Sequence, residues 1–234
     1  MNKRLGKIRN LLLFTLLFLT PIYPSLSAGK VGNQNFQSQS EVSSTKKYGA
    51  AYTWYETGNK LYRQRRYLES VAAYEKAISI DPELDLAING KAWAFKNLDD
   101  LPKSLAAFEE AIEINPYSDQ HWNGKGNILY YMSRYRKSLK AYNRALKINP
   151  ESANSYSGKA WALARLEKYE KAIKVFDQAI DVNDRSANYW NGKGWALYKL
   201  GRFQEAKKTL NIARILEPRN TYTARYLKLV EKEL

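Results

Sequence analysis

The chain repeats itself with a 34-residue period, and this period limits its fold more than any other feature of the sequence. Alanine stands at one position of every unit: Ala77, Ala111, Ala145, Ala179 and Ala213. A large side chain occupies position 4 of each unit: Trp54, Ile88, Trp122, Tyr156 and Trp190. A small residue follows four places later: Gly58, Ala92, Gly126, Ala160 and Gly194. Five copies in one register without gaps indicate a single structural unit used five times.

Each unit has the pattern of two helices joined by a short turn. In the last copy, Trp190 and Leu197 belong to the first helix, residues 200–202 form the turn, and the second helix carries Leu210 and ends at Pro218. Small residues between the large ones allow two antiparallel helices to approach closely. Because neither helix can bury its apolar face alone, we expect the units to stack on neighbours of the same kind.

This pattern resembles the tetratricopeptide repeat, a helix–turn–helix unit of about 34 residues, and the resemblance extends from position 51 to position 220. It implies an all-α, right-handed superhelical solenoid. Its repeats would span residues 51–84, 85–118, 119–152, 153–186 and 187–220. Departures are small: position 7 is lysine in four copies, and Asp184 replaces a proline found at Pro82, Pro116, Pro150 and Pro218. Residues 221–234 begin a further helix without a partner, and we expect this segment to be the capping helix that a solenoid needs.

The segment that precedes the repeats has a different composition. Residues 1–27 combine four basic residues, an apolar run and small residues near a cleavage point, which predicts a signal peptide and export to a bacterial envelope or beyond. The alternative is an uncleaved membrane anchor through residues 8–28. Residues 28–50 are rich in Gln, Ser, Asn and Gly without an apolar period, so we expect a flexible linker there.

The sequence carries little catalytic chemistry. It has no cysteine, which excludes disulfides, thiol nucleophiles and thiolate metal sites. His121 is the one histidine, and we expect it at the surface near a helix N-terminus. The Asn-Gly-Lys-Gly segments do not match a phosphate-binding loop and lie inside helices. We therefore predict a protein that is not an enzyme and uses no metal or cofactor.

Binding chemistry is more visible. In the resembled family the concave groove is lined by positions 2, 5, 6, 9, 12 and 13 of the first helix of each repeat. From positions 5, 9, 12 and 13 the predicted groove residues are Tyr55, Asn59, Tyr62, Asn89, Trp93, Asn123, Asn127, Tyr130, Trp161, Arg165, Asn191, Trp195 and Tyr198. Aromatic rings offer contact area, and asparagine pairs with both polar groups of a peptide backbone.

We therefore predict a non-enzymatic scaffold that binds an extended peptide or protein segment, with a glycan as the alternative occupant. The family's carboxylate clamp is not matched, because Tyr55 and Asn123 stand where it needs lysine. Two further expectations concern packing. The position-4 tryptophans, Trp54, Trp122 and Trp190, are expected in the core. The position-6 glycines are interpreted as sites of tight packing beside aromatic rings, with close approach of a ligand as the alternative.

Charge is unevenly distributed. The net charge of the whole chain is +15, yet repeat 2 carries −3 and repeat 3 carries +5. The basic residues of repeat 3 are predicted on an outer face: Arg134, Arg136, Lys137, Lys140 and Arg144. Such a face suits an anionic polymer or membrane surface, or is simply a solvated helix surface. Nucleic acid is not favoured, and the sequence leaves the oligomeric state open.

Overall fold

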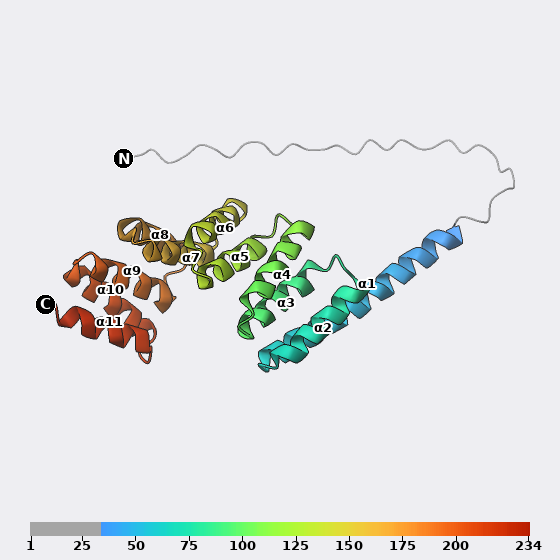
Figure 1. Cartoon of the computed structure of the whole chain (residues 1–234), viewed down its shortest axis with the longest axis horizontal. Coiled ribbons are helices and arrows are strands. Elements are labelled where there is room, and N and C mark those ends of the chain that lie inside the picture. The colour runs from blue at the N-terminus through green and yellow to red at the C-terminus, as the bar shows by residue number, and fades with distance from the viewer. Residues whose placement is uncertain (1–33) are drawn as a thin grey trace, which may run out of the picture. The chain divides into compact units, whose positions relative to one another are not determined.

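The computed structural model describes residues 34–234, and side chains from residue 49 onward; the predicted signal peptide at residues 1–27 lies outside this part. The chain divides into two units, residues 1–40 and 41–234, and the repeats belong to the second. The described residues form helices joined by short turns and loops, without strands (Figure 1). The helices are α1 (Gln34–Arg63), α2 (Tyr67–Ile80), α3 (Asp85–Asn97), α4 (Leu101–Ile114), α5 (Asp119–Tyr131), α6 (Tyr135–Ile148), α7 (Ala153–Arg165), α8 (Tyr169–Val182), α9 (Ala187–Lys199), α10 (Phe203–Leu216) and α11 (Thr221–Glu231).

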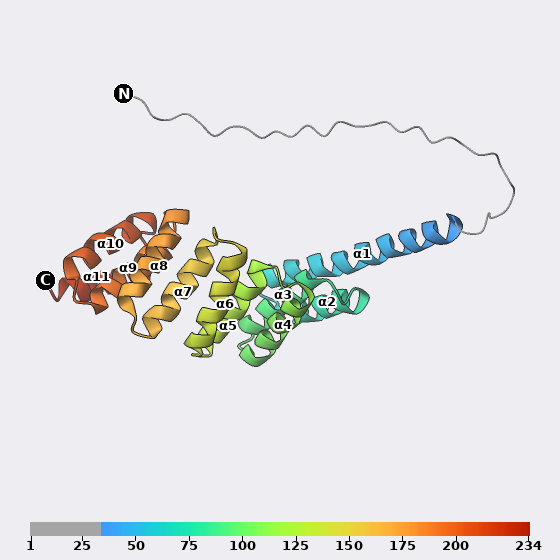
Figure 2. The same ribbon diagram turned by 90° about the horizontal axis from the view of Figure 1, so that it is seen from above.

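The predicted solenoid is confirmed. Each helix from α3 to α11 packs against its predecessor in the chain, and α3, α5, α7, α9 and α11 also contact one another in sequence. Figure 2 shows these helices stacking side by side. We call α1, α3, α5, α7 and α9 the A helices and α2, α4, α6, α8 and α10 the B helices. The A helices of repeats 2 to 5 begin at Asp85, Asp119, Ala153 and Ala187, each one repeat period after the last.

A flexible linker was expected over residues 28–50, but the structure has a helix over the part of this segment that it describes, residues 34–50. Helix α1 begins at Gln34 and continues through residue 50 into the A helix of repeat 1. Residues 34–50 contain no proline, and glutamine, serine and lysine can all be accommodated in a helix that already has a packed continuation. Residues 28–33 lie outside the described part of the chain.

The turn between A and B helices has the same backbone in every repeat. Position 15 has a positive φ at Arg65, Asp99, Ser133, Glu167 and Gly201, with values between 58° and 73°. The next residue donates its N–H to a carbonyl five residues back, as Arg202 does to Leu197 at 3.0 Å. These are the features of a Schellman C-cap, which turns the chain sharply enough for B to pack on A.

The position-6 glycines are explained by packing, as predicted. A Cβ added to Gly158 would lie 2.5 Å from Cε1 of Tyr142, and one added to Gly126 would lie 2.7 Å from the same atom. The buried aromatic residue of this B helix therefore sits between a glycine of its own repeat and a glycine of the next. In repeat 2 the corresponding ring is Phe108, against Gly124.

The position-4 tryptophans are not in the core, and this corrects the expectation for Trp54, Trp122 and Trp190. All three are half-buried. The indole Nε1–H of Trp122 donates to the Pro116 carbonyl at 2.9 Å, and that of Trp190 to the Asp184 carbonyl at 2.8 Å. These two rings thus cover the loop preceding their repeat. In repeat 1 a cation from the B helix covers the ring, with Lys76 over Trp54 at 4.2 Å.

The C-terminal segment is a cap, as predicted. Val230 and Leu227 of α11 are buried in one cluster with Leu197 and Leu210 of repeat 5. Asn220 is the N-cap residue, and its Oδ1 accepts from the backbone N–H groups of the second and third residues of α11. This arrangement covers the apolar end of the last repeat.

Candidate functional site

Two pockets lie on the face formed by the A helices, and each contains side chains from several repeats. The N-terminal pocket has a volume of about 310 Å³ and is lined by Tyr55, Asn59, Tyr62, Tyr74, Leu86, Asn89, Gly90, Trp93 and Gln120. The C-terminal pocket has a volume of about 540 Å³ and is lined by Asn127, Tyr130, Tyr131, Tyr142, Asn154, Ser157, Gly158, Trp161, Asn188, Asn191, Asn220, Tyr222 and Tyr226.

The predicted groove residues divide into three groups. Tyr55, Asn59, Tyr62, Asn89 and Trp93 line the N-terminal pocket. The C-terminal pocket takes in Asn127, Tyr130, Trp161 and Asn191. Neither pocket is lined by Asn123, Arg165, Trp195 or Tyr198.

The remaining four predicted residues are engaged with other side chains of the chain. Asn123 Nδ2 donates to Ser155 Oγ at 2.8 Å, and Arg165 Nε donates to the Tyr135 hydroxyl at 3.0 Å. The Trp195 ring packs against Trp161 with centroids 5.8 Å apart, and Tyr198 packs against Phe203 at the same distance. In three of these four cases the partner belongs to the neighbouring repeat, so these groove positions join one repeat to the next.

Position 2 and the cap supply pocket residues that the prediction left out. Asn154 and Asn188 stand at position 2 of repeats 4 and 5, and both are exposed in the C-terminal pocket. Position 2 belongs to the groove positions of the resembled family, so the omission could have been avoided. Tyr222 and Tyr226 come from α11, which was expected only to cover the last repeat.

Both pockets are lined by uncharged residues, although the chain as a whole is strongly basic. No Asp, Glu, Lys, Arg or His is among the residues that line either pocket. Burial raises the pKa of Tyr74 to about 12, and burial likewise raises the pKa of Tyr130 and Tyr142. The phenols therefore remain uncharged at physiological pH. The pockets offer amide groups, hydroxyls and aromatic rings to a ligand.

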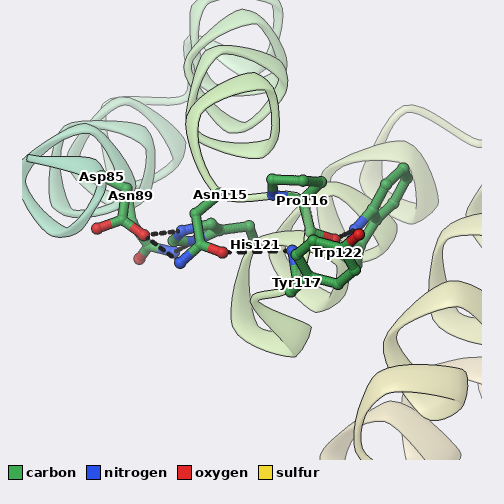
Figure 3. A network of polar contacts seen from close by, with 7 residues as sticks. All are labelled: Asp85, Asn89, Asn115, Pro116, Tyr117, His121 and Trp122. Atoms are coloured by element: carbon green, nitrogen blue, oxygen red, sulfur yellow. Dashed lines mark hydrogen bonds and ion pairs between the residues drawn. The ribbon is translucent and has the colours of Figure 1, made fainter. Parts of the chain in front are cut away.

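His121 lies in the core between repeats 2 and 3, which corrects the expectation that it is a surface residue. Its side chain is 1% exposed. In the tautomer protonated at Nε2, that nitrogen donates to Asp85 Oδ2 at 2.9 Å and Nδ1 accepts from Asn89 Nδ2 at 2.7 Å (Figure 3). Asn115 Nδ2 donates to the same carboxylate oxygen at 2.8 Å.

The Asp85 carboxylate is held in its charged form by this network. Burial raises its pKa, but the hydrogen bonds from His121 and Asn115 outweigh burial, so that the pKa lies below its ordinary value. The neighbours of His121 at position 3 indicate why the histidine is buried, because that position is Ala87 in repeat 2 and Ser155 in repeat 4, both buried. The residue at position 3 varies in size across the other repeats, so its size does not predict the burial of His121: Thr53, Ala87, Ser155 and Tyr189.

Hydrogen bonds between positions 5 and 3 recur at several junctions. Asn89 pairs with His121, Asn123 with Ser155, and Asn191 with Thr223 of the cap. The Thr223 hydroxyl donates to Asn191 Oδ1 at 2.9 Å, and Asn191 is 4% exposed. Position-5 asparagines therefore serve in part to join repeats, and less of their hydrogen-bonding capacity faces a ligand than we predicted.

The predicted basic residues of repeat 3 are placed at the start and along α6. Arg134, Arg136, Lys137 and Lys140 are exposed. Arg144 is half-buried, with its guanidinium 6.0 Å from the centre of the Trp122 ring.

Among the described residues, no group of His, Asp or Glu could hold a metal ion. Over the same residues, no helix combines the length and apolar character needed to cross a membrane.

The stacked helix pairs define a helical-repeat protein with two pockets on the face of its A helices. Family models described as tetratricopeptide repeat match residues 51–84, 87–118, 123–181 and 158–221. Together these matches cover most of the chain, and the protein belongs to the tetratricopeptide repeat family. Members of this family are typically non-catalytic scaffolds that bind protein or peptide partners.

Solved structures show the same fold at low sequence identity. PilF of Pseudomonas aeruginosa has a TM-score of 0.71 at 17% identity, over 80% of this chain and 86% of that chain. TTC0263 of Thermus thermophilus has a TM-score of 0.67 at 18% identity, over 78% and 100%. YrrB, described as a TPR protein with an unusual peptide-binding site, has a TM-score of 0.61 at 16% identity, over 81% and 97%. The comparison with curated proteins found no match.

Proposed function

We propose that this protein is a non-catalytic scaffold that holds an extended segment of a partner protein on its A-helix face. The observation that carries the proposal is the neutral lining of the two pockets, in which amide and hydroxyl groups stand beside aromatic rings. An extended peptide presents one N–H and one C=O per residue, and both can pair with asparagine. The peptide-binding site ascribed to YrrB, which shares the fold, supports the same assignment.

Two variants test whether the A-helix face binds. Trp161→Ala removes a half-buried ring of the C-terminal pocket, and we expect it to weaken peptide binding by about 2 kcal/mol or more, because buried aromatic anchors dominate binding. The loss should hardly change with salt. The matched variant reverses charge at Arg136, Lys137 and Lys140 on α6, and should alter mainly the association rate, with an effect that fades as salt rises.

Binding is measured by titration with capped uncharged peptides, with helical circular dichroism as the control for folding. If charge reversal abolishes binding while Trp161→Ala has no effect, the ligand face is the basic surface of α6 and the proposal is wrong. That outcome would favour an anionic polymer or membrane surface as the partner of residues 134–144.

A neutral glycan is the second candidate, because the C-terminal pocket places an indole ring beside amide side chains. Trp161 shares this pocket with the amides of Asn154 and Asn188. Aromatic faces can pack on the C–H face of a sugar while amides bond its hydroxyls. Parallel titrations with neutral oligosaccharides and with peptides separate the two candidates. Trp161→Ala should weaken the binding of whichever class binds the wild-type protein.

We further propose that the protein is exported. The basic, apolar and small-residue pattern of residues 1–27 supports this proposal. Cell fractionation with N-terminal sequencing should find a mature chain that starts near Ala28. Full-length protein in washed membranes would favour the anchor, and full-length protein in the cytosol would contradict export.

A further inference from the structure

The two pockets contain similar side chains, displaced by two repeats. Eight of the nine residues that line the N-terminal pocket have their counterpart, two repeats further on, in the lining of the C-terminal pocket. Five of these pairs are identical: Asn59 and Asn127, Tyr62 and Tyr130, Tyr74 and Tyr142, Gly90 and Gly158, Trp93 and Trp161. The other three pairs are Leu86 and Asn154, Asn89 and Ser157, Gln120 and Asn188.

Apart from the glycine pair, which recurs in every repeat from the second on, the identical pairs do not follow from the 34-residue period. At the same repeat positions, the intervening repeat has Trp93 in place of Asn59, Lys96 in place of Tyr62 and Phe108 in place of Tyr74. The pocket residues therefore follow a period of two repeats, superimposed on the one-repeat period of the fold. Packing of the solenoid does not require it, because repeats 2 and 4 fold on the same backbone with the other side chains.

The contacts within the two pockets are also the same. The Tyr74 hydroxyl donates to Asn59 Oδ1 at 2.7 Å, and the Tyr142 hydroxyl donates to Asn127 Oδ1 at 2.9 Å. At the tryptophan of each pocket, the indole meets a phenylalanine edge to face, at 5.2 Å for Trp93 and 5.4 Å for Trp161. The same hydrogen bond and the same ring contact thus recur two repeats apart.

Each of these asparagines keeps one amide hydrogen for a ligand. Asn59 Nδ2 donates one hydrogen to Glu56 Oε1 at 3.3 Å, and Asn127 Nδ2 donates one to Asn123 Oδ1 at 2.9 Å. Because an asparagine NH₂ group carries two donors, the second hydrogen is left for a carbonyl beside the tryptophan. The oxygen of each amide, held by the phenol, fixes the orientation of this donor.

We propose that the chain carries two equivalent binding sites and that one extended partner occupies both with two similar segments. The proposal rests on the proposed function and names the ligand more closely: a segment without ionised side chains, whose carbonyl oxygens accept from Asn59 and Asn127. An acidic or basic side chain would find no counter-ion among the lining residues of either site, and its desolvation would be uncompensated.

The spacing of the two sites sets the spacing of the two segments. Helices α3, α5, α7 and α9 contact one another in sequence, and packed helix axes lie about 10 Å apart. Two repeats therefore separate equivalent atoms by roughly 20 Å, which is about six residues of extended chain. A partner with similar uncharged segments about six residues apart would fit both sites without a long linker.

The C-terminal pocket has extra walls that the N-terminal pocket lacks. Asn220, Tyr222 and Tyr226 of the cap region line it, and its volume is about 540 Å³ against about 310 Å³. More aromatic surface is therefore available to a ligand in this pocket, and we expect it to bind a single segment more tightly. The N-terminal pocket would be occupied second and would gain from the tethering of the partner.

The test follows the indole N–H signals of the six tryptophans by NMR in the full chain, assigned by Trp→Phe substitution. The probe is a pooled library of N-acetylated, C-amidated six-residue peptides without ionisable side chains. We expect the signals of Trp93 and Trp161 to shift, at different midpoints. The best peptide is then synthesised as a tandem of two copies and should bind at least about tenfold more tightly than one copy.

Asn59→Ser and Asn127→Ser are the matched variants, because serine keeps a hydroxyl at the position but loses the amide donor. Each should abolish the shift at its own tryptophan and the gain of the tandem peptide. A shift at Trp161 alone, or a tandem gain that survives both variants, would overturn the two-site inference while leaving the proposed function intact. Absence of any shift with uncharged peptides, with both variants and wild type folded, would overturn the proposed function itself.

Discussion

Repeats 1 and 3 fill the same positions as repeats 2 and 4 with different chemistry. In repeats 1 and 3 the B helix carries a tyrosine at position 24, and its hydroxyl bonds the asparagine at position 9, as in Tyr142 and Asn127. In repeats 2 and 4 the same positions hold phenylalanine and tryptophan in edge-to-face contact, as in Phe108 and Trp93. The backbone and the contact of each ring with the glycine of the next repeat are shared, whereas the residue of its own repeat is glycine in repeats 1 and 3 and alanine in repeats 2 and 4. A buried aromatic ring at position 24 is therefore common to the packing of all four repeats, while the side chain at position 9 of the A helix alternates between asparagine and tryptophan.

The largest effect is expected where the ring meets the glycine of the next repeat. Gly158→Ala should destabilise the protein by about 3 kcal/mol and Gly124→Ala by about 2 kcal/mol, since overpacking outweighs the gain of about 1 kcal/mol in helix propensity. A Cβ at Gly124 would come closer to Phe108 than a Cβ at Gly158 would come to Tyr142. We still expect the larger cost at Gly158, because moving Tyr142 also strains its bond to Asn127. Urea denaturation measures both. Gly49→Ala is the control, since a Cβ there meets nothing within 4 Å and should not destabilise.

The second prediction exchanges the chemistry of one repeat for that of the other. Phe108→Tyr should cost about 2 kcal/mol, because the added hydroxyl meets the Trp93 ring and leaves a buried donor unpaired. Combining it with Trp93→Asn should recover most of the loss by recreating the tyrosine–asparagine bond of repeats 1 and 3. A double-mutant cycle in urea gives the coupling. Strictly additive losses would show that the two kinds of repeat are not interchangeable at these positions.

The third prediction concerns position 1, where repeats 2 and 3 both carry an aspartate that accepts from an asparagine, but only Asp85 also accepts from a histidine. The pKa of Asp85 lies below its ordinary value, so its carboxylate stabilises the fold above about pH 4 and this contribution is lost as pH falls through the lower folded value. Asp85→Asn should cost about 1 kcal/mol at pH 7 and progressively less below about pH 4.

Thermal melts between pH 7 and pH 2 provide the measurement, with Asp119→Asn as the matched variant. Asp119 has the asparagine partner Asn149 at 3.1 Å and no histidine partner among the described residues. We expect its substitution to change the pH dependence less. Equal changes for the two variants would mean that His121 contributes nothing to the stability of the charged carboxylate.

The smallest effect is expected at position 15, where all repeats share one backbone. Glu167 has a φ of 60°, and Gly201 occupies the equivalent position at 73°. Glu167→Gly should stabilise by up to about 1 kcal/mol because glycine adopts this region without a Cβ penalty, and Gly201→Ala should destabilise by about the same amount. Differential scanning calorimetry resolves both changes. A loss of stability in Glu167→Gly would mean that its side chain contributes more than the backbone strain costs.

Much of the fold could be predicted because the 34-residue period sets helix boundaries, turns and the capping helix together. The site was predicted less completely, since a groove position tells which way a side chain points but not whether another repeat already binds it. Asn123 and Asn191 were predicted to bind ligand, and each bonds to the following repeat or the cap. His121 gave no local signal, because its two partners lie 32 and 36 residues earlier in the chain.

The His121 network also bears on how the chain avoids assembling in the wrong order. Repeats of one length and one backbone can stack out of sequence, within a chain or between two chains, and such misassembly is a characteristic failure of repeat proteins. A misordered stack that is shifted by two repeats would bring similar pocket residues to equivalent places. Of the possible misordered stacks, the packing of the repeats therefore disfavours this one least. In that arrangement repeat 3 would follow repeat 4, and His121 would meet Ala153 and Ser157 where Asp85 and Asn89 belong. A buried imidazole without its carboxylate would destabilise the misordered stack, and this one junction thereby marks the correct order of the repeats.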